Sequence, residues 1–245
     1  FDNMLKSIFK TATFKQSLIT FTGSILNGLL GGLFYIFVAR ELGPQDFGLL
    51  TISIVSLTLI SDVADIGVNT GLIRFVSSNL LKNEVKAMQF LKLSLEIKIV
   101  VWILVFMSVF LFSPFLAEEI FHKTELILPL RLVAFGVGGA LLFSFATSTL
   151  QAYQKYFLWS GVNIISNFLR LIFVLILSYL LSLNLNSSLF VFIILPFFGF
   201  FMTMLILPAK KIISASGEVA LSKELFRYNI PIAIFTLIAA ISSRL

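Results

Sequence analysis

Seven amide or charged side chains stand inside stretches of the sequence that are otherwise strongly apolar. They are Asn27, Asp62, Asp65, Arg131, Asn163, Asn167 and Arg170. Polar groups within membrane spans are costly, so they usually face a bundle interior or a watery cavity and mark a substrate or ion pathway. The chemistry to look for is therefore binding and transport inside apolar surroundings.

The most regular of these patterns is Asn163, Asn167 and Arg170, which follow one another at i, i+4 and i+7. This spacing places the three side chains on one face of a helix. A guanidinium is always charged and can bind a phosphate with two hydrogen bonds, so the face favours recognition of an anion. The candidate substrate or cavity residues are Arg170, Arg131, Asn163, Asn167 and Asn27.

Asp62 and Asp65 are three residues apart, so they lie on roughly one face of a helix near its inner end. One interpretation is that they take up a coupling cation. The other is that they neutralise Arg131 or Arg170 on a neighbouring helix. Lys98 stands near the inner end of the next apolar run, where we expect its long side chain to reach the membrane interface.

Two groups of glycines are expected to let helices approach one another closely. Gly28 and Gly32 have the small-xxx-small spacing that is common at contacts between membrane helices. Gly136, Gly138 and Gly139 cluster near the middle of another apolar run. Close packing is the simplest role for the first pair, and the second cluster permits close packing or a bend.

The elements that must position these side chains are six long apolar runs. They cover residues 17–39, 47–67, 91–115, 126–149, 157–183 and 188–207, and a seventh begins at Ile230. About 20 apolar residues cross a hydrocarbon core of about 30 Å as a helix. We therefore predict an all-α, polytopic transmembrane bundle. Its parts are a basic cytoplasmic lead-in at 1–16, a six-helix lobe at 17–207, a cytoplasmic linker at 208–229 and the start of a seventh helix at 230–245.

Composition excludes several classes of protein. A mean hydropathy of +1.03 with 12% charged residues is outside the range of soluble globular proteins. The chain has no cysteine and a single histidine, His122, so thiolate and His-rich metal sites are excluded. No motif of a hydrolase, nucleotide-binding loop or zinc enzyme is present. We expect no metal, no cofactor and no enzymatic activity.

The net charge of +6 follows the topology and does not indicate a nucleic-acid partner. With a cytoplasmic N-terminus, the inner segments hold twelve basic residues and the outer ones hold only Arg40 and Lys123. This asymmetry is the positive-inside bias of membrane proteins. It predicts that 69–90, 150–156 and 208–229 lie inside and that 40–46, 116–125 and 184–187 lie outside. The twelve are Lys6, Lys10, Lys15, Arg74, Lys82, Lys86, Lys92, Lys155, Lys210, Lys211, Lys223 and Arg227.

Several short motifs resemble those of a known transporter family. Residues 38–48 read VARELGPQDFG, residues 65–67 read DIG and are followed by Arg74, and residues 150–156 read LQAYQKY. The sequence resembles polysaccharide-biosynthesis flippases of the Wzx/RfbX type, which belong to the multidrug/oligosaccharidyl-lipid/polysaccharide (MOP) exporter superfamily.

The resemblance implies two six-helix lobes around a central cavity, of which the first lobe and the start of the second are present here. It implies alternating access, a plasma-membrane location and a polyprenyl-diphosphate-linked oligosaccharide as substrate. The partners that it implies are this lipid-linked oligosaccharide, the bilayer and other polysaccharide-assembly proteins.

Two alternatives remain at this level. An antiporter of drugs or organic cations from the same superfamily would use acidic residues such as Asp62 and Asp65. A membrane glycosyltransferase or polymerase would need a large outer loop with catalytic side chains, whereas the outer connections are short. The chain lacks an initiator Met and stops inside an apolar run, so we expect it to be part of a longer protein.

Overall fold

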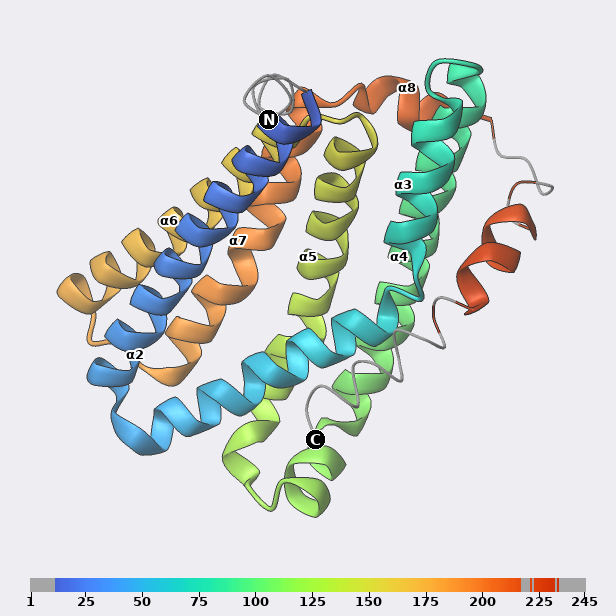
Figure 1. The fold of residues 1–245 in the computed structure, drawn as a ribbon. Coiled ribbons are helices and arrows are strands. Elements are labelled where there is room, and N and C mark those ends of the chain that lie inside the picture. The colour runs from blue at the N-terminus through green and yellow to red at the C-terminus, as the bar shows by residue number, and fades with distance from the viewer. Residues whose placement is uncertain (1–11, 217–220, 222, 232, 234–245) are drawn as a thin grey trace.

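The computed structural model describes residues 12–216, 221, 223–231 and 233. Helices joined by short connections make up this part of the chain, and it contains no β-strand (Figure 1). The helices are α2 (Ala12–Ala64), α3 (Val68–Asn79), α4 (Glu84–Phe115), α5 (Ile127–Ala152), α6 (Tyr156–Leu180), α7 (Leu185–Ile206) and α8 (Ala209–Ser214). A π-helical turn (Leu116–Ile120) and a 3-10 turn (Thr124–Leu126) connect α4 to α5.

Helix α2 consists of two arms that meet at a sharp bend. Gly43 has φ 72° and ψ 175°, and Pro44 follows it directly. A positive φ suits glycine, and proline is well placed at the start of the second arm. Figure 1 shows the chain descending along the first arm and reversing into the second. Residues 17–39 and 47–67 are thus two elements, as predicted.

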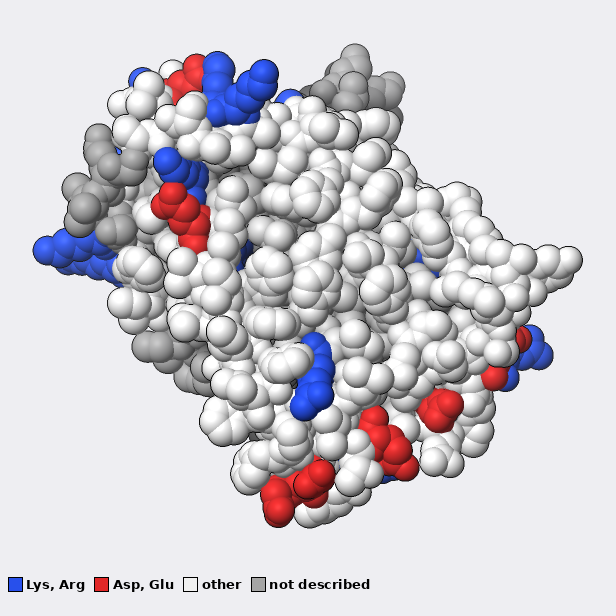
Figure 2. All heavy atoms as spheres, turned by 180° about the vertical axis from the view of Figure 1, so that it is seen from behind, with Lys and Arg blue, Asp and Glu red and all other residues white. Residues whose placement is uncertain are grey.

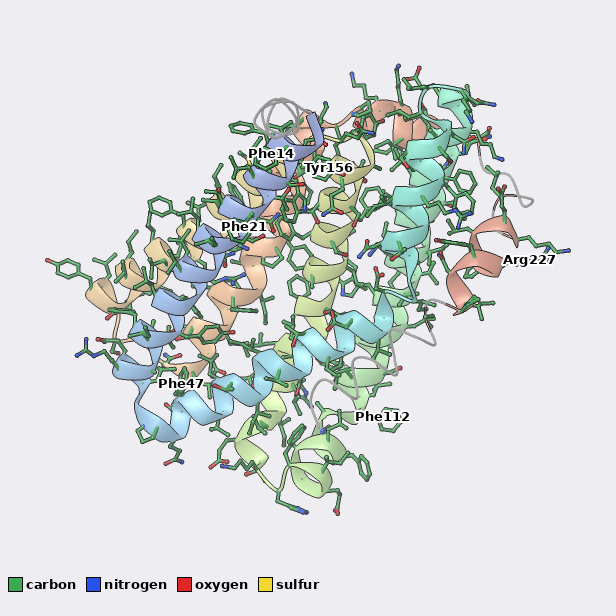
Figure 3. The ribbon with its side chains drawn as sticks, in the orientation of Figure 1. Phe14, Phe21, Phe47, Phe112, Tyr156 and Arg227 are labelled. Atoms are coloured by element: carbon green, nitrogen blue, oxygen red, sulfur yellow. The ribbon has the colours of Figure 1, made fainter. Side chains whose placement is uncertain are left out.

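Five helices of the described chain are long and apolar enough to cross a membrane, and the longest of them includes both arms of α2. When the arms are counted separately, these helices correspond to the six predicted runs. The prediction of an all-α polytopic bundle is therefore confirmed. Apolar side chains such as Phe21 and Phe112 are more than half exposed and point out of the bundle, as a lipid-facing surface requires (Figure 3).

A second break separates α2 from α3. Ile66 and Gly67 have φ of 49° and 68°, so the helix stops after Ala64 and a new one starts at Val68. The segment 69–90, which we predict to lie inside, contains most of α3 and the start of α4. The two helices pack against each other, and α4 begins at Glu84, where Asn83 accepts a hydrogen bond from the backbone of Lys86.

Helix α5 lies at the centre of the bundle, and its glycines explain why other helices approach it so closely. A Cβ on Gly138 would lie 2.0 Å from the Trp102 ring of α4, and one on Gly139 would lie 2.7 Å from Phe197 of α7. The close packing predicted for this cluster is confirmed. No neighbouring residue of the described chain lies within 4 Å of a Cβ placed on Gly28 or Gly32, so the close contact predicted there is not formed by these residues.

Gly138→Ala should destabilise the protein by about 1–3 kcal/mol, because the new methyl group overpacks the contact with Trp102. Gly161→Ala is the matched control. It lies on α6 with open space around its Cβ position, and alanine favours the helix by up to about 1 kcal/mol. Thermal unfolding in detergent measures both. Equal midpoints for the two variants would contradict the packing around α5.

The connections between helices gather at two ends of the bundle (Figure 1). The turn from α3 to α4, the turn from α5 to α6 and α8 lie at one end, with the start of α2. The bend at Gly43, the segment from α4 to α5 and the turn from α6 to α7 lie at the other. This alternation matches the predicted order of inner and outer segments. In Figure 2 most charged side chains lie near the rim of a broad uncharged face.

Single cysteines should report the two ends directly, since the chain has none of its own. We expect Asn186→Cys to react with an impermeant thiol reagent from outside the cell and Ser216→Cys only after the inner face is opened. Both side chains are exposed, and Asn186 avoids the capping box that Asn184 and Ser187 form at the start of α7. Labelling of both positions from the same face would contradict the topology.

The described residues of the predicted linker at 208–229 fold against the end of α3 and the start of α4. Lys211 pairs with Glu84 at 2.8 Å, and Lys86 pairs with Glu224 at 3.2 Å. Leu225 is fully buried beside residues of α3 and α4. The helix predicted from Ile230 and the lead-in at 1–16 lie mostly outside the described residues.

Candidate functional site

The polar stripe of α6, which consists of Asn163, Asn167 and Arg170, faces the first arm of α2. The side-chain amide of Asn167 donates a short hydrogen bond to the side-chain oxygen of Asn27. Asn163 donates to the carbonyl of Trp159 at 2.8 Å, and its own carbonyl accepts a longer bond, 3.4 Å, from Asn167. The structure therefore brings together the three asparagines that the sequence singled out, because α2 and α6 pack along one another.

Arg170 continues this stripe one turn further along α6. Its Nη1 donates to the side-chain oxygen of Asn167 at 2.9 Å. The guanidinium lies over the ring of Phe192 of α7, 4.0 Å from the centroid, and 5.9 Å from that of Phe34 of α2. Asn167 thus connects Asn27 to Arg170, and the two aromatic rings attract the guanidinium as a cation.

The positive charge of Arg170 has no acidic partner in the part of the chain that the structure describes. No Asp or Glu oxygen of these residues lies within 4.0 Å of its guanidinium. Its Nε is buried and has no hydrogen-bond acceptor among them. A charged group at this depth costs at least ~2.5–3.5 kcal/mol on insertion scales. Arg170 is therefore a fixed cation with unused donor capacity.

Arg131 lies elsewhere. It stands in the second turn of α5, where Nε donates to the hydroxyl of Ser113 at 3.1 Å and the guanidinium lies 5.0 Å from the centroid of Phe110. Both partners lie near the C-terminal end of α4. Arg170 instead contacts α2 and α7, so no contact in the described structure joins the two arginines.

Asp65 pairs with Lys98 and with neither arginine. The Lys98 Nζ lies 2.6 Å from Asp65 Oδ1 and donates a second hydrogen bond to the hydroxyl of Ser144 at 2.9 Å. The Lys98 side chain is 1% exposed, so the expectation that it reaches the membrane interface was wrong. Asp62 lies next to this pair and lines a cavity of about 180 Å³ between α2, α3 and α5.

The expectation for Lys98 was wrong because helix α4 begins several residues before the apolar run does. The apolar run begins at Leu91, which puts Lys98 close to the inner end. The helix itself begins at Glu84, so Lys98 stands 14 residues along it, or about 21 Å at 1.5 Å per residue. The capping signal Asn83-Glu84 was present in the sequence and would have indicated the true start.

Comparison with known proteins identifies the family. A model of the family described as "Polysaccharide biosynthesis protein" matches residues 13–245. The chain belongs to this family. The match covers the bend at Gly43, the break at Ile66 and Gly67, and every side chain of the polar stripe. No curated protein gave a significant match.

This member of the polysaccharide biosynthesis family is similar in structure to solved transporters. One similar structure is a MOP superfamily transporter from Pyrococcus furiosus, whose report infers a different function from the reversed polarity of its binding pocket. It has a TM-score of 0.74 at 14% identity. A multidrug resistance MATE family transporter of the MOP superfamily, in an outward-facing conformation, has a TM-score of 0.70 at 13% identity.

Each comparison covers 90% of this chain and 51% of the transporter. The chain therefore spans about half the length of these structures. At such low identity the likeness shows the fold alone, which is the fold predicted from the sequence.

Proposed function

We propose that this chain belongs to a flippase that moves a polyprenyl-diphosphate-linked oligosaccharide across the cytoplasmic membrane by alternating access. Membership of the polysaccharide biosynthesis family and the MOP transporter fold support a role in membrane transport. The single observation that carries the choice of substrate is that the half-buried Arg170 has a buried Nε without an acceptor and no acidic oxygen within 4.0 Å among the described residues. A fixed cation with unused donors favours an anionic substrate.

The geometry indicates a role for each residue of the stripe. Arg170 would bind the diphosphate or an acidic sugar, because a guanidinium presents paired donors to phosphate and carboxylate oxygens. Asn167 holds the guanidinium through its side-chain oxygen and is itself held by Asn27. Asn163 extends the polar face toward the inner end of α6. These amides orient the cation without neutralising it.

Arg131 would act as a separate anion contact near the outer end. Its hydrogen bond to Ser113 and its contact with Phe110 leave it partly exposed. In the proposed cycle, a substrate released from Arg170 meets this second positive charge on the outer side. The two contacts belong to different steps, because no contact joins the two arginines in the described structure.

The drug or organic-cation antiporter is the weaker candidate. Such a substrate requires an acidic or aromatic cavity, and Asp65 is already compensated by Lys98 at 2.6 Å. A glycosyltransferase or polymerase is disfavoured because the outer connections are short, for example residues 181–184 between α6 and α7. We therefore propose a transporter in the plasma membrane with a cytoplasmic N-terminus.

A strain that depends on the full-length protein provides the functional test. On depletion, we expect the lipid-linked oligosaccharide to accumulate on the inner leaflet while its synthesis continues. Accessibility of the glycan to a lectin, in inside-out compared with right-side-out vesicles, measures the leaflet. Normal appearance of the glycan on the outer leaflet after depletion would contradict the proposal.

A further inference from the structure

We propose that a cavity between the starts of α2 and α6 binds neutral sugars of the transported glycan while Arg170 holds its anionic group. This inference rests on the proposed function, because it concerns a second part of the same substrate. The cavity has a volume of about 490 Å³, and sites for small ligands usually have about 300–1,000 Å³. It is lined by Gln16, Ser17, Thr20, Phe21, Ser24 and Tyr156.

The cavity continues the polar stripe of α6 toward the start of that helix. Tyr156 stands seven residues before Asn163 and 14 before Arg170, so the three side chains share one face of the helix. Fourteen residues of helix span about 21 Å at 1.5 Å per residue. On α2, Ser24 stands three residues before Asn27, which contacts the stripe. The cavity and Arg170 are therefore two ends of one polar seam between α2 and α6.

The first arm of α2 has two exposed faces of different character. Ser17, Ser24 and Gly28 follow one another at i, i+7 and i+11, and all three are exposed. This spacing places them on one small, polar face. Leu29 and Leu33 are 60% and 52% exposed on another face, which suits contact with lipid. Hydroxyl groups without hydrogen bonds are costly in hydrocarbon, so the polar face suits an aqueous cavity and a hydrophilic glycan.

Several polar groups of the cavity have unused hydrogen-bonding capacity. The side chains of Gln16, Ser17, Ser24 and Tyr156 make no hydrogen bond to any described residue. Thr20 donates its hydrogen to the carbonyl of Gln16 at 2.9 Å, so its oxygen can only accept another bond. An amide and several hydroxyls offer both donors and acceptors, as the hydroxyls of a sugar do. None of these groups is an acid or a base, which suits neutral sugar units.

Two aromatic rings border the cavity from different helices. Phe21 belongs to α2 and Tyr156 to α6, and Figure 3 shows both toward the end of the bundle where these helices begin. The face of an aromatic ring is apolar and carries partial negative charge, so it attracts the C–H groups of a sugar ring. The cavity thus combines partners for the hydroxyls of a sugar with partners for its C–H face.

Binding of two lipids to the purified full-length protein in detergent tests this subsite. One is the lipid-linked oligosaccharide of the host strain, and the other is polyprenyl diphosphate without sugar. We expect the wild type to bind the first at least about tenfold more tightly, the effect of one or two additional hydrogen bonds. Ser24→Leu should remove this preference, because leucine fills the cavity and deletes a hydroxyl, and should leave the affinity for the bare diphosphate unchanged.

Thr22→Leu is the matched control. Thr22 is exposed on the same arm of α2 but lies outside this cavity, so the variant should bind both lipids as the wild type does. Gln16→Ala provides a second test, since it removes an amide from the lining and should also reduce the preference for the glycan. Thermal unfolding in detergent should give similar midpoints for all three variants, because each change leaves the packed face of the helix intact.

The outcomes distinguish the subsite from the proposed function. Equal affinity of the wild type for the two lipids would overturn the subsite, and so would an unchanged preference in Ser24→Leu and Gln16→Ala. If the wild type still binds the bare diphosphate and Arg170→Ala does not, the proposed function stands without the subsite. If neither lipid binds the wild type, the proposed function fails together with the subsite.

Discussion

Arg170→Ala should abolish transport of the lipid-linked oligosaccharide while the protein still inserts and folds. Loss of a charge-assisted contact to a buried anion costs about 2–5 kcal/mol, which corresponds to a fall in transport of about 30-fold or more. Removal of an unpaired cation also relieves the cost of burying it, so stability should not decrease sharply. Transport in vesicles and the amount of folded protein in the membrane are the two measurements.

Arg170→Lys should restore transport only partly, because an ammonium is a point charge without the planar pair of donors that Asn167 and Phe192 now orient. Arg227→Ala is the matched control, since Arg227 is exposed and its side chain points away from the bundle (Figure 3). Normal transport by Arg170→Ala would show that Arg170 has a structural role only.

Breaking the buried ion pair should have the largest effect on stability. Lys98→Met leaves Asp65 without its partner, and such a change costs about 3–5 kcal/mol. The double variant Asp65→Asn/Lys98→Met should recover most of the loss, because it leaves no uncompensated charge. We expect the midpoint of thermal unfolding in detergent to be highest for the wild type, lower for the double variant and lowest for Lys98→Met.

Lys211→Met provides the control for this series. Lys211 pairs with Glu84 at 2.8 Å, but both side chains are more than half exposed, so the loss should stay below about 1 kcal/mol. If Lys98→Met were as mild as Lys211→Met, the pair with Asp65 would not stabilise the lobe.

If Asp62→Asn and Asp65→Asn leave both expression and transport unchanged, neither aspartate acts in pairing or coupling.

The apolar runs predicted the fold well because helix length and hydropathy follow directly from the thickness of the membrane. The bend at Gly43-Pro44 could also be predicted from the sequence, since both residues have specific backbone preferences. The break at Ile66 and Gly67 was harder to foresee, because isoleucine with a positive φ is unusual and depends on tertiary contacts.

The candidate site was predictable only within one helix. Periodicity placed Asn163, Asn167 and Arg170 on one face, and the structure shows that this face meets Asn27 of α2. The partner of Asp65 was not predictable in this way. A pair between Asp65 and Lys98 depends on how α2 and α4 pack, and no spacing in a single sequence specifies that.

Transbilayer movement in proteoliposomes measures whether the protein moves a diphosphate-linked glycan and whether Arg170 is needed for it. The full-length protein is reconstituted with a fluorescent oligosaccharide carried on a polyprenyl diphosphate, or with the same glycan on an uncharged lipid, and the outer-leaflet label is quenched over time. We expect rapid movement of the diphosphate-linked glycan by the wild type, little by Arg170→Ala, and little movement of the uncharged lipid by either protein. Equal movement of both lipids, or equal rates for wild type and Arg170→Ala, would contradict it.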